Sequence, residues 1–154
     1  MKIASERVAA VARVHRHFYM GQASESISCL EYIRRLCADL SVILNTPIEV
    51  EGDDGKIAST LVQPVGLLVN ELITNAAKHG GGKIVVSYRS QAGKRTLRVC
   101  DRGKGLPPDF NVEASRTGLG MKVISILTKQ LKGTLTAGAN SEGSGSCFEV
   151  SFPA

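Results

Sequence analysis

The stretch LLVNELITNAAKHGGG, residues 67–82, places a line of polar side chains on an otherwise apolar helix. Glu71, Asn75 and Lys78 follow one another at helical spacing, so they fall within about 60° of the helix circumference. The opposite side is apolar and is predicted to face the core. Its residues are Val62, Val65, Val69, Leu72, Ile73 and Ala76. This pattern requires a helix with one buried face and a separate polar edge.

The polar edge has the chemistry of a metal–phosphate site. Leu67 and Leu68 also lie near it, which favours a half-apolar cleft over the alternative of a solvated outer face. An amide oxygen and a carboxylate suit Mg²⁺ or its waters, so Asn75 and Glu71 are candidate metal ligands. Lys78 offers a point charge to phosphate. The chain contains neither GxxxxGK[ST] nor GxGxxG, which excludes the phosphate-binding loops that those motifs form.

Two glycine-containing segments follow this helix. CDRGKGLPP places Asp101 directly after a predicted strand, where it could accept a hydrogen bond from adenine N6, and Gly103 and Gly105 would let a flat ring approach the backbone. RTGLGMKV places Gly118 and Gly120 at a predicted helix N-terminus, where N–H groups attract phosphate. Each motif alone is weak, but the order of the three together predicts a purine nucleotide site.

Residues 1–45 are predicted to form a helical region of two amphipathic helices. The first carries Val8, Val11, Val14 and Phe18 at helical spacing. The second is expected to begin after an N-cap at Ser24 or Ser26, and its apolar face includes Ile27, Leu30, Ile33, Cys37 and Leu40. Two interpretations stay open for this hairpin, a small lid on the core or half of a dimerisation bundle.

Residues 46–154 are predicted to form an α/β sandwich, a two-layer α+β arrangement with a mixed sheet and helices on one face. The expected order is strand, strand, helix, strand, strand, loop, helix, strand, strand. Ser59 or Thr60 caps the long helix, with Pro64 tolerated in its first turn. QAG forms a hairpin turn, Gly133 ends the second helix, and SEGSGS is interpreted as a flexible loop.

Composition limits the classes of partner. The 154 residues carry a net charge of +5, but no run of like charges, no Trp, three Tyr and four Phe, so no nucleic-acid platform is expected. No apolar run is long enough to cross a membrane, and the N-terminus lacks the pattern of a signal peptide. The fragment is therefore expected to be cytoplasmic, without membrane contact. The four cysteines form no CxxC pair and are interpreted as reduced, mostly buried thiols.

The polar-edge helix, DRGKGLP and TGLGM resemble the N, G1 and G2 boxes of the GHKL ATP-binding fold, which histidine kinases share with gyrase-type ATPases, Hsp90 chaperones and MutL proteins. The chain is most similar to sensor histidine kinases of the HisKA_2 type. NELITNAAKHG, GLGMKVISILTKQLKG and GSGSCFEVSFP fit that type. RVAAVARVHRHFY and SISCLEYIRRLCADL resemble the second helix of its dimerisation and phosphotransfer hairpin and the connection to the catalytic domain.

The resemblance implies roles for residues on the polar-edge helix. Asn75 would coordinate Mg²⁺. Glu71 would orient the attacking group, accept its proton, or hold a metal-bound water. Lys78 would contact phosphate, with His79 beside it. The resemblance therefore makes the first three of these the catalytic residues, with Mg²⁺ and ATP as cofactors.

The resemblance also implies how the nucleotide is held. Asp101 would bind adenine N6, with Gly103 and Gly105 shaping the pocket floor and Ser146 assisting Asp101 through a water. Residues 106–117 would form a mobile lid over ATP. The remaining residues expected to contact the nucleotide are Leu106 and Thr117 at the ends of that lid, and Gly118, Leu119 and Gly120, which would close over the phosphates.

The chain departs from the family pattern in two places. Arg102 stands where many relatives have asparagine. More importantly, the box that carries the phospho-accepting histidine is missing, because His15 and His17 match the second hairpin helix instead. The acceptor is therefore expected outside this chain, which is interpreted as a fragment cut inside the hairpin. A natural domain without that helix is the alternative.

The resulting prediction is the ATP-binding catalytic portion of a sensor histidine kinase. It would transfer the γ-phosphoryl of Mg-ATP to a histidine of the dimerisation domain in the same parent protein, for relay to a response regulator, and the parent would be a homodimer. One alternative is a serine kinase of the anti-sigma-factor type, against which the N-terminal hairpin argues. Another is an ATP-free phosphotransfer or scaffold protein, against which Asn75 and Asp101 argue. Gyrase- or Hsp90-type ATPases are least favoured, because they usually have longer lids and a transducer domain.

Overall fold

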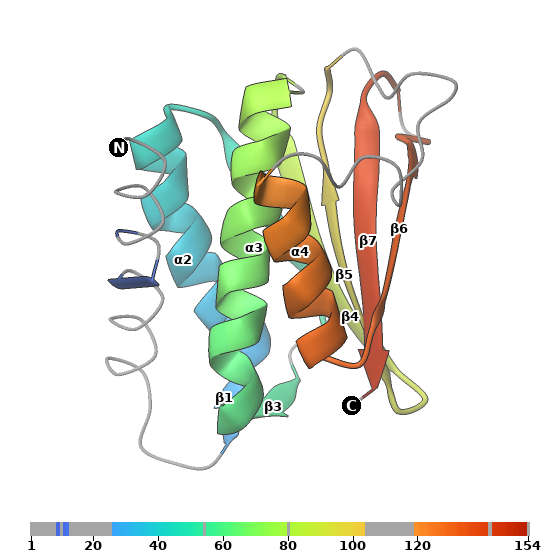
Figure 1. The fold of residues 1–154 in the computed structure, drawn as a ribbon. Coiled ribbons are helices and arrows are strands. Elements are labelled where there is room, and N and C mark those ends of the chain that lie inside the picture. The colour runs from blue at the N-terminus through green and yellow to red at the C-terminus, as the bar shows by residue number, and fades with distance from the viewer. Residues whose placement is uncertain are drawn as a thin grey trace.

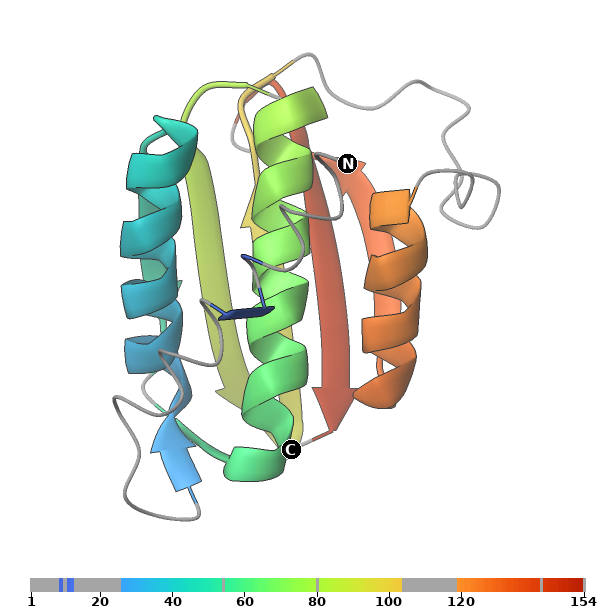
Figure 2. The same ribbon diagram turned by 60° about the vertical axis from the view of Figure 1, so that its left-hand side comes forward.

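In the computed structural model, the described part of the chain has helices α2, α3 and α4 packed against one face of a five-stranded sheet (Figure 1). The structure describes residues 9, 11–12, 26–53, 55–79, 81–103, 119–141 and 143–153. Its elements are, in chain order, β1 (Ser26–Ser28), α2 (Cys29–Leu44), β2 (Ile48–Gly52), β3 (Lys56–Ala58), α3 (Ser59–His79), β4 (Ile84–Gln91), β5 (Lys94–Cys100), α4 (Leu119–Gln130), β6 (Thr134–Ala139) and β7 (Ser146–Pro153). Figure 2 shows the helices side by side in front of the sheet, with α3 in the middle.

The main sheet is mixed, as predicted. Its strand order is β2-β4-β5-β7-β6, with β2 parallel to β4 and every other neighbouring pair antiparallel. The predicted element order from residue 46 onward is confirmed, although β3 leaves the main sheet and pairs with β1 instead. The hairpin turn between β4 and β5 is also confirmed. Ala92 and Gly93 both have positive φ, 51° and 74°, as a two-residue turn requires.

The core lies between the helices and the sheet, and α2 and α3 contribute most of its helical residues. The residues predicted for the buried face of α3 are all buried. Leu68, predicted near the polar edge, is instead 0% exposed and belongs to the core. The reason is that α3 is flanked by both α2 and α4, so it is buried over more of its circumference than a helix at the side of the layer (Figure 2).

Two predicted helix boundaries were wrong. Ser26 does not cap α2, because it pairs with Ala58 in the two-stranded sheet. The N-cap is Ser28, whose hydroxyl accepts a hydrogen bond from the Glu31 N–H at 3.4 Å. Pro64 lies in the interior of α3 rather than in its first turn. The first predicted helix falls almost wholly outside the described residues.

The cysteine prediction was wrong for two of the four residues. Cys100 and Cys147 form a disulfide, whereas Cys29 and Cys37 are free and buried. The β5–β7 register places Cys100 directly opposite Cys147, and a pairing between residues 47 positions apart leaves no local signal in the sequence. Burial raises the pKa of both the Cys29 and the Cys37 thiol to about 12, which keeps them protonated and unreactive at neutral pH.

Gly52 is expected to be a stability determinant of the parallel β2–β4 pair. It has φ +144°, and a Cβ at this position would lie 2.0 Å from the Tyr88 carbonyl oxygen. Gly52→Ala should therefore lower the free energy of unfolding by about 3 kcal/mol, measured by urea denaturation. The control is Gly93→Ala, since Gly93 also has positive φ (+74°) but open space around it, and should cost only about 1 kcal/mol. Equal losses in the two variants would contradict a steric role for Gly52.

Candidate functional site

The predicted motifs meet at one end of the sandwich. There α3 and β5 end, and α4 and β7 begin (Figure 1). The Arg102 N–H donates to the Gly81 carbonyl at 2.8 Å, which joins the segment after β5 to the segment after α3. The Asp101 N–H donates to the Ser146 carbonyl at 2.9 Å, which joins it to β7. Three segments that are far apart in the sequence are therefore held together by the backbone.

Asp101 is fixed at the centre of this arrangement. The residue is only 3% exposed. Oδ1 accepts hydrogen bonds from the N–H groups of Gly103 at 2.9 Å and Ser146 at 3.4 Å, and Oδ2 accepts one from the Ser146 hydroxyl at 3.0 Å. A carboxylate offers about four lone-pair positions, so the oriented group can accept one further donor.

Ser146 lies directly beside Asp101. Its hydroxyl donates to Oδ2 of the carboxylate at 3.0 Å, and its contribution through a water at the nucleotide stays a prediction. The two residues are adjacent because of the strand register: Cys147 lies opposite Cys100, which brings the residue before Cys147 next to the residue after Cys100. Ser146 is also buried, and its hydroxyl bond helps to hold the carboxylate in one orientation.

Close packing around Asp101 depends on residues that the sequence analysis did not select. Gly145 has φ +106°, and a Cβ there would lie 2.0 Å from the Asp101 carbonyl oxygen. The Asn140 side chain donates to that same oxygen at 2.9 Å, and the Ser144 hydroxyl donates to the Arg102 carbonyl at 3.1 Å. The described part of SEGSGS is thus a packed support for the site, not simply a flexible loop. The sequence carries one signal of this support, because Gly145 stands immediately before the predicted core strand.

The polar edge of α3 runs from the interior toward solvent. Glu71 is 8% exposed, Asn75 is half-buried and Lys78 is exposed. The alternative of a solvated outer face is therefore wrong for Glu71. Carboxylates are seldom buried without partners, so the surroundings of Glu71 differ from those of a carboxylate on a solvated surface. Asn75 and Lys78 continue the edge toward the end of the helix, where Gly81 meets the segment after β5.

Several predicted site residues lie at the edge of the described structure or beyond it. Leu119 and Gly120 are the first two residues of α4, and His79 is the last residue of α3. Gly105, Leu106, Thr117 and Gly118 fall outside the described residues, as does the rest of the predicted lid at 106–117. Among the described residues, no three His, Cys, Asp or Glu side chains gather in a way that could hold a metal ion.

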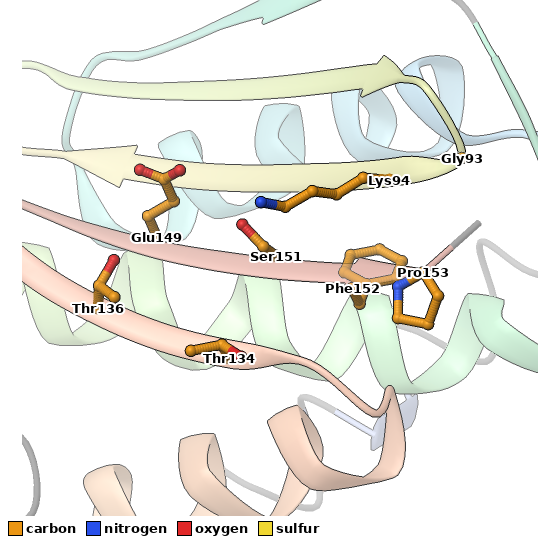
Figure 3. Close-up of a pocket in the computed structure, with 8 residues that line it drawn as sticks. All are labelled: Gly93, Lys94, Thr134, Thr136, Glu149, Ser151, Phe152 and Pro153. Atoms are coloured by element: carbon orange, nitrogen blue, oxygen red, sulfur yellow. The ribbon is translucent and has the colours of Figure 1, made fainter.

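A shallow hollow of about 590 Å³ lies elsewhere, on the sheet face opposite the helices. Figure 3 shows Lys94, Glu149 and Ser151 standing on this face. Its lining residues are Gly93, Lys94, Thr134, Thr136, Glu149, Ser151, Phe152 and Pro153. These include the start of β5 and the end of β7, whereas Asp101 and Ser146 lie at the end of β5 and the start of β7. The hollow is therefore separate from the candidate site.

None of the helices in the described part of the chain combines the length and hydropathy that a bilayer crossing requires.

Two family models match the chain. The one described as histidine kinase-, DNA gyrase B- and HSP90-like ATPase matches residues 61–154, which include the polar edge of α3, Asp101 and Ser146. The HisKA_2 model, described as histidine kinase, matches residues 1–44. Together the two matches cover the helical region and most of the sandwich.

Individual relatives carry histidine kinase names. A blue-light-activated histidine kinase of Rhizobium johnstonii is 29% identical over 145 residues, covering 89% of this chain and 40% of the relative. A sensor histidine kinase of Mycobacterium tuberculosis, PdtaS, is 28% identical over 140 residues, covering 84% of this chain and 28% of the relative. The chain therefore spans less than half the length of these curated relatives.

The fold also matches a solved structure. The histidine kinase domain of the Erythrobacter litoralis blue-light-activated kinase EL346 superposes with a TM-score of 0.76 at 24% identity, covering 97% of this chain and 73% of that one. At this identity the match bears on the fold, and it agrees with the layers and helix positions described above.

Proposed function

Because this chain belongs to the family of histidine kinase-, DNA gyrase B- and HSP90-like ATPases, and is the ATP-binding catalytic portion of a sensor histidine kinase, we propose that the whole protein transfers the γ-phosphoryl group of Mg-ATP to a histidine. The acceptor would lie in the dimerisation domain, outside this chain. A response regulator would then receive the phosphoryl group. The parent protein would act as a homodimer in the cytoplasm.

The observation that carries this proposal is the Asp101 carboxylate, held by Gly103 and Ser146 beside the end of α3. Adenine presents an exocyclic amine, a hydrogen-bond donor, to such an acceptor. Because protein donors fix the carboxylate in advance, little rotamer freedom is lost when the base binds. Gly103 lies directly beside the carboxylate, and Gly105 would extend the same floor under the ring.

The residues present on α3 fit a magnesium–phosphate group. Mg²⁺ in nucleotide sites is usually held by one or two protein oxygens together with the phosphates and waters. Asn75 supplies an amide oxygen on a half-buried position, and Glu71 supplies a carboxylate one turn earlier. When bound, the ion would neutralise charge on the phosphates. Lys78, with His79 beside it, would contact phosphate from the exposed end of the same edge.

The chain would promote transfer by position and charge rather than by a covalent intermediate of its own. Lys78 would offset charge developing on the transferred group. Glu71 would orient the attacking histidine or accept its proton. Leu119 and Gly120, the first two residues of α4, together with Gly118, which precedes them in the sequence, would present backbone N–H groups to the phosphates. Residues 106–117 would close over ATP and exclude water.

The other candidate functions are not favoured. The named relatives are histidine kinases. Residues 1–44 match a histidine kinase model, whereas serine kinases of the anti-sigma-factor type usually begin at the catalytic domain. These findings disfavour a serine kinase of the anti-sigma-factor type. The intact carboxylate support at Asp101 disfavours an ATP-free scaffold, because such a scaffold has no need for an oriented buried acceptor.

The proposal is tested by calorimetric titration with a non-hydrolysable ATP analogue. We expect saturable binding that strengthens about tenfold when Mg²⁺ is present, because Asn75 and Glu71 would hold the ion and it would offset the charge of the phosphates. The matched control is the corresponding GTP analogue, whose carbonyl oxygen would face the Asp101 carboxylate in place of an amine. It should bind at least about tenfold more weakly. An absence of ATP binding with and without Mg²⁺ would overturn the proposal in favour of the ATP-free scaffold.

A further inference from the structure

The disulfide between Cys100 and Cys147 directly adjoins the proposed nucleotide site. Cys100 is the residue before Asp101, and Cys147 is the residue after Ser146. We propose that this bond is a redox-controlled clamp that sets the affinity of the site for its nucleotide by holding Asp101 against Ser146. The inference rests on the proposed function, and it adds a modification site that controls the same carboxylate.

The position of the bond in the sheet supports a role at the site. Cys100 and Cys147 form the last residue pair of the β5–β7 ladder, where an antiparallel pair would otherwise fray. Beyond them, Asp101 and Ser146 remain joined by the hydrogen bond from the Asp101 N–H at 2.9 Å and by the hydroxyl contact to Oδ2 at 3.0 Å. The covalent bond restrains both strands at the point from which these two residues extend.

The bond faces the side of the sheet that the helices do not cover. Val99 and Phe148 belong to the core, so the alternate residues Cys100 and Cys147 point to the opposite face. Cys147 is 5% exposed but lies outside the core cluster, and Cys100 is half-buried. On β6 the residue opposite Cys147 is Gly138. A Cβ at Gly138 would have no atom within 4 Å, so the space beside Cys147 on this face is open. A small thiol reagent can approach from this direction.

The two remaining thiols do not offer the same chemistry. Cys29 and Cys37 lie on the buried face of α2. Their pKa is raised to about 12 by burial, so the reactive thiolate form is suppressed. Among the described cysteines, thiol–disulfide exchange is therefore favoured at the pair beside Asp101. A disulfide in a cytoplasmic protein is usually transient and redox-sensing rather than permanent.

The chemical step is an exchange with a dithiol. One thiolate of the reductant attacks a sulfur of the disulfide and forms a mixed disulfide, and the second thiol of the reductant then displaces the protein sulfur. Two electrons and two protons pass to the protein. The products are the Cys100 thiol, the Cys147 thiol and the disulfide of the reductant. Oxidation by a disulfide of the same class reverses the step.

The test compares the affinity of oxidised and reduced protein for the ATP analogue with Mg²⁺, measured by calorimetry. Alkylation followed by mass mapping of the thiols defines the redox state of each sample. We expect dithiothreitol to weaken binding about fivefold, because the unclamped strand ends no longer hold the carboxylate in advance. The Cys100→Ala/Cys147→Ala variant should bind the analogue as weakly as the reduced protein does, and its affinity should not change when dithiothreitol is added. The control Cys37→Ala removes a buried thiol away from the site and should keep the full redox response.

Two further measurements keep this inference separate from the proposed function. Amide hydrogen exchange at Gly103 and Ser146 should be faster after reduction, whether or not nucleotide is added. By reciprocity, the ATP analogue should shift the equilibrium of the disulfide with dithiol buffers by the same factor of about five.

Equal affinity and equal exchange in both forms would overturn the clamp and leave the proposed function standing. Free Cys100 and Cys147 thiols in the oxidised sample would also overturn it. Failure of both forms to bind would overturn the proposed function, and the clamp with it.

Discussion

Replacing Asp101 with asparagine is expected to lower the affinity for ATP about 100-fold while leaving the protein folded. The asparagine oxygen can take the place of Oδ1 and accept from the N–H groups of Gly103 and Ser146. Its NH₂ group would take the place of Oδ2 and donate to the Ser146 hydroxyl, which can reverse its role. The variant therefore retains the local hydrogen bonds, but its NH₂ group is a donor at the position where the exocyclic amine of adenine needs an acceptor. Loss of a charge-assisted hydrogen bond is worth about 1.5–3 kcal/mol.

The measurement is calorimetric titration with the ATP analogue, with urea denaturation as the check on folding. Asp53→Asn is a matched control. The Asp53 carboxylate also accepts a backbone hydrogen bond, from Ser90 at 3.0 Å, but it lies beside the end of β4 rather than beside the end of β5. That variant should bind ATP like the unaltered protein. An affinity for ATP that is unchanged in Asp101→Asn would show that Asp101 does not contact the base.

Local patterns in the sequence were enough to predict the element order and the polar edge of α3. The apolar face of α3 repeats at helical spacing, and the turn at Ala92 and Gly93 carries its signal in two adjacent residues. The position of Asp101 directly after a strand was also a local feature. These predictions held because each depended on residues close together in the chain, where spacing alone determines which side chains share a face.

The features that escaped prediction depend on pairings between distant segments. The sequence indicates a helix cap at Ser26 because its pairing with Ala58 is not visible locally. The same limit hid the Cys100–Cys147 bond and the support that Gly145 gives to Asp101. Leu68 was misplaced because the burial of α3 depends on having a helix on each side. In every case, the sheet register or the helix layer decided the outcome, and neither can be read from the periodicity of one element.

Asn75→Ala is expected to remove the Mg²⁺ dependence of ATP binding and to lower phosphoryl transfer by the full-length parent about 100-fold or more. In the proposed site Asn75 would hold the ion, which would neutralise charge on the phosphates, and loss of one such stabilising contact typically reduces the rate by a factor of about 10²–10³. Folding should be retained, because Asn75 is only half-buried on α3 and alanine is the better helix former. Calorimetry with and without Mg²⁺, and transfer from labelled ATP, measure the two effects.

The two variants should divide the site into its base and phosphate parts. Gln63→Ala is the control for Asn75→Ala, since Gln63 is exposed on the same helix but near its first turns, and it should change neither readout. Without Mg²⁺, Asn75→Ala should bind ATP as the unaltered protein does, whereas Asp101→Asn should bind weakly under both conditions. If Asn75→Ala kept its tenfold response to Mg²⁺, the ion would have to be held elsewhere. Asp101 would then still define a purine site, but the polar edge of α3 would lose its assigned role in phosphate chemistry.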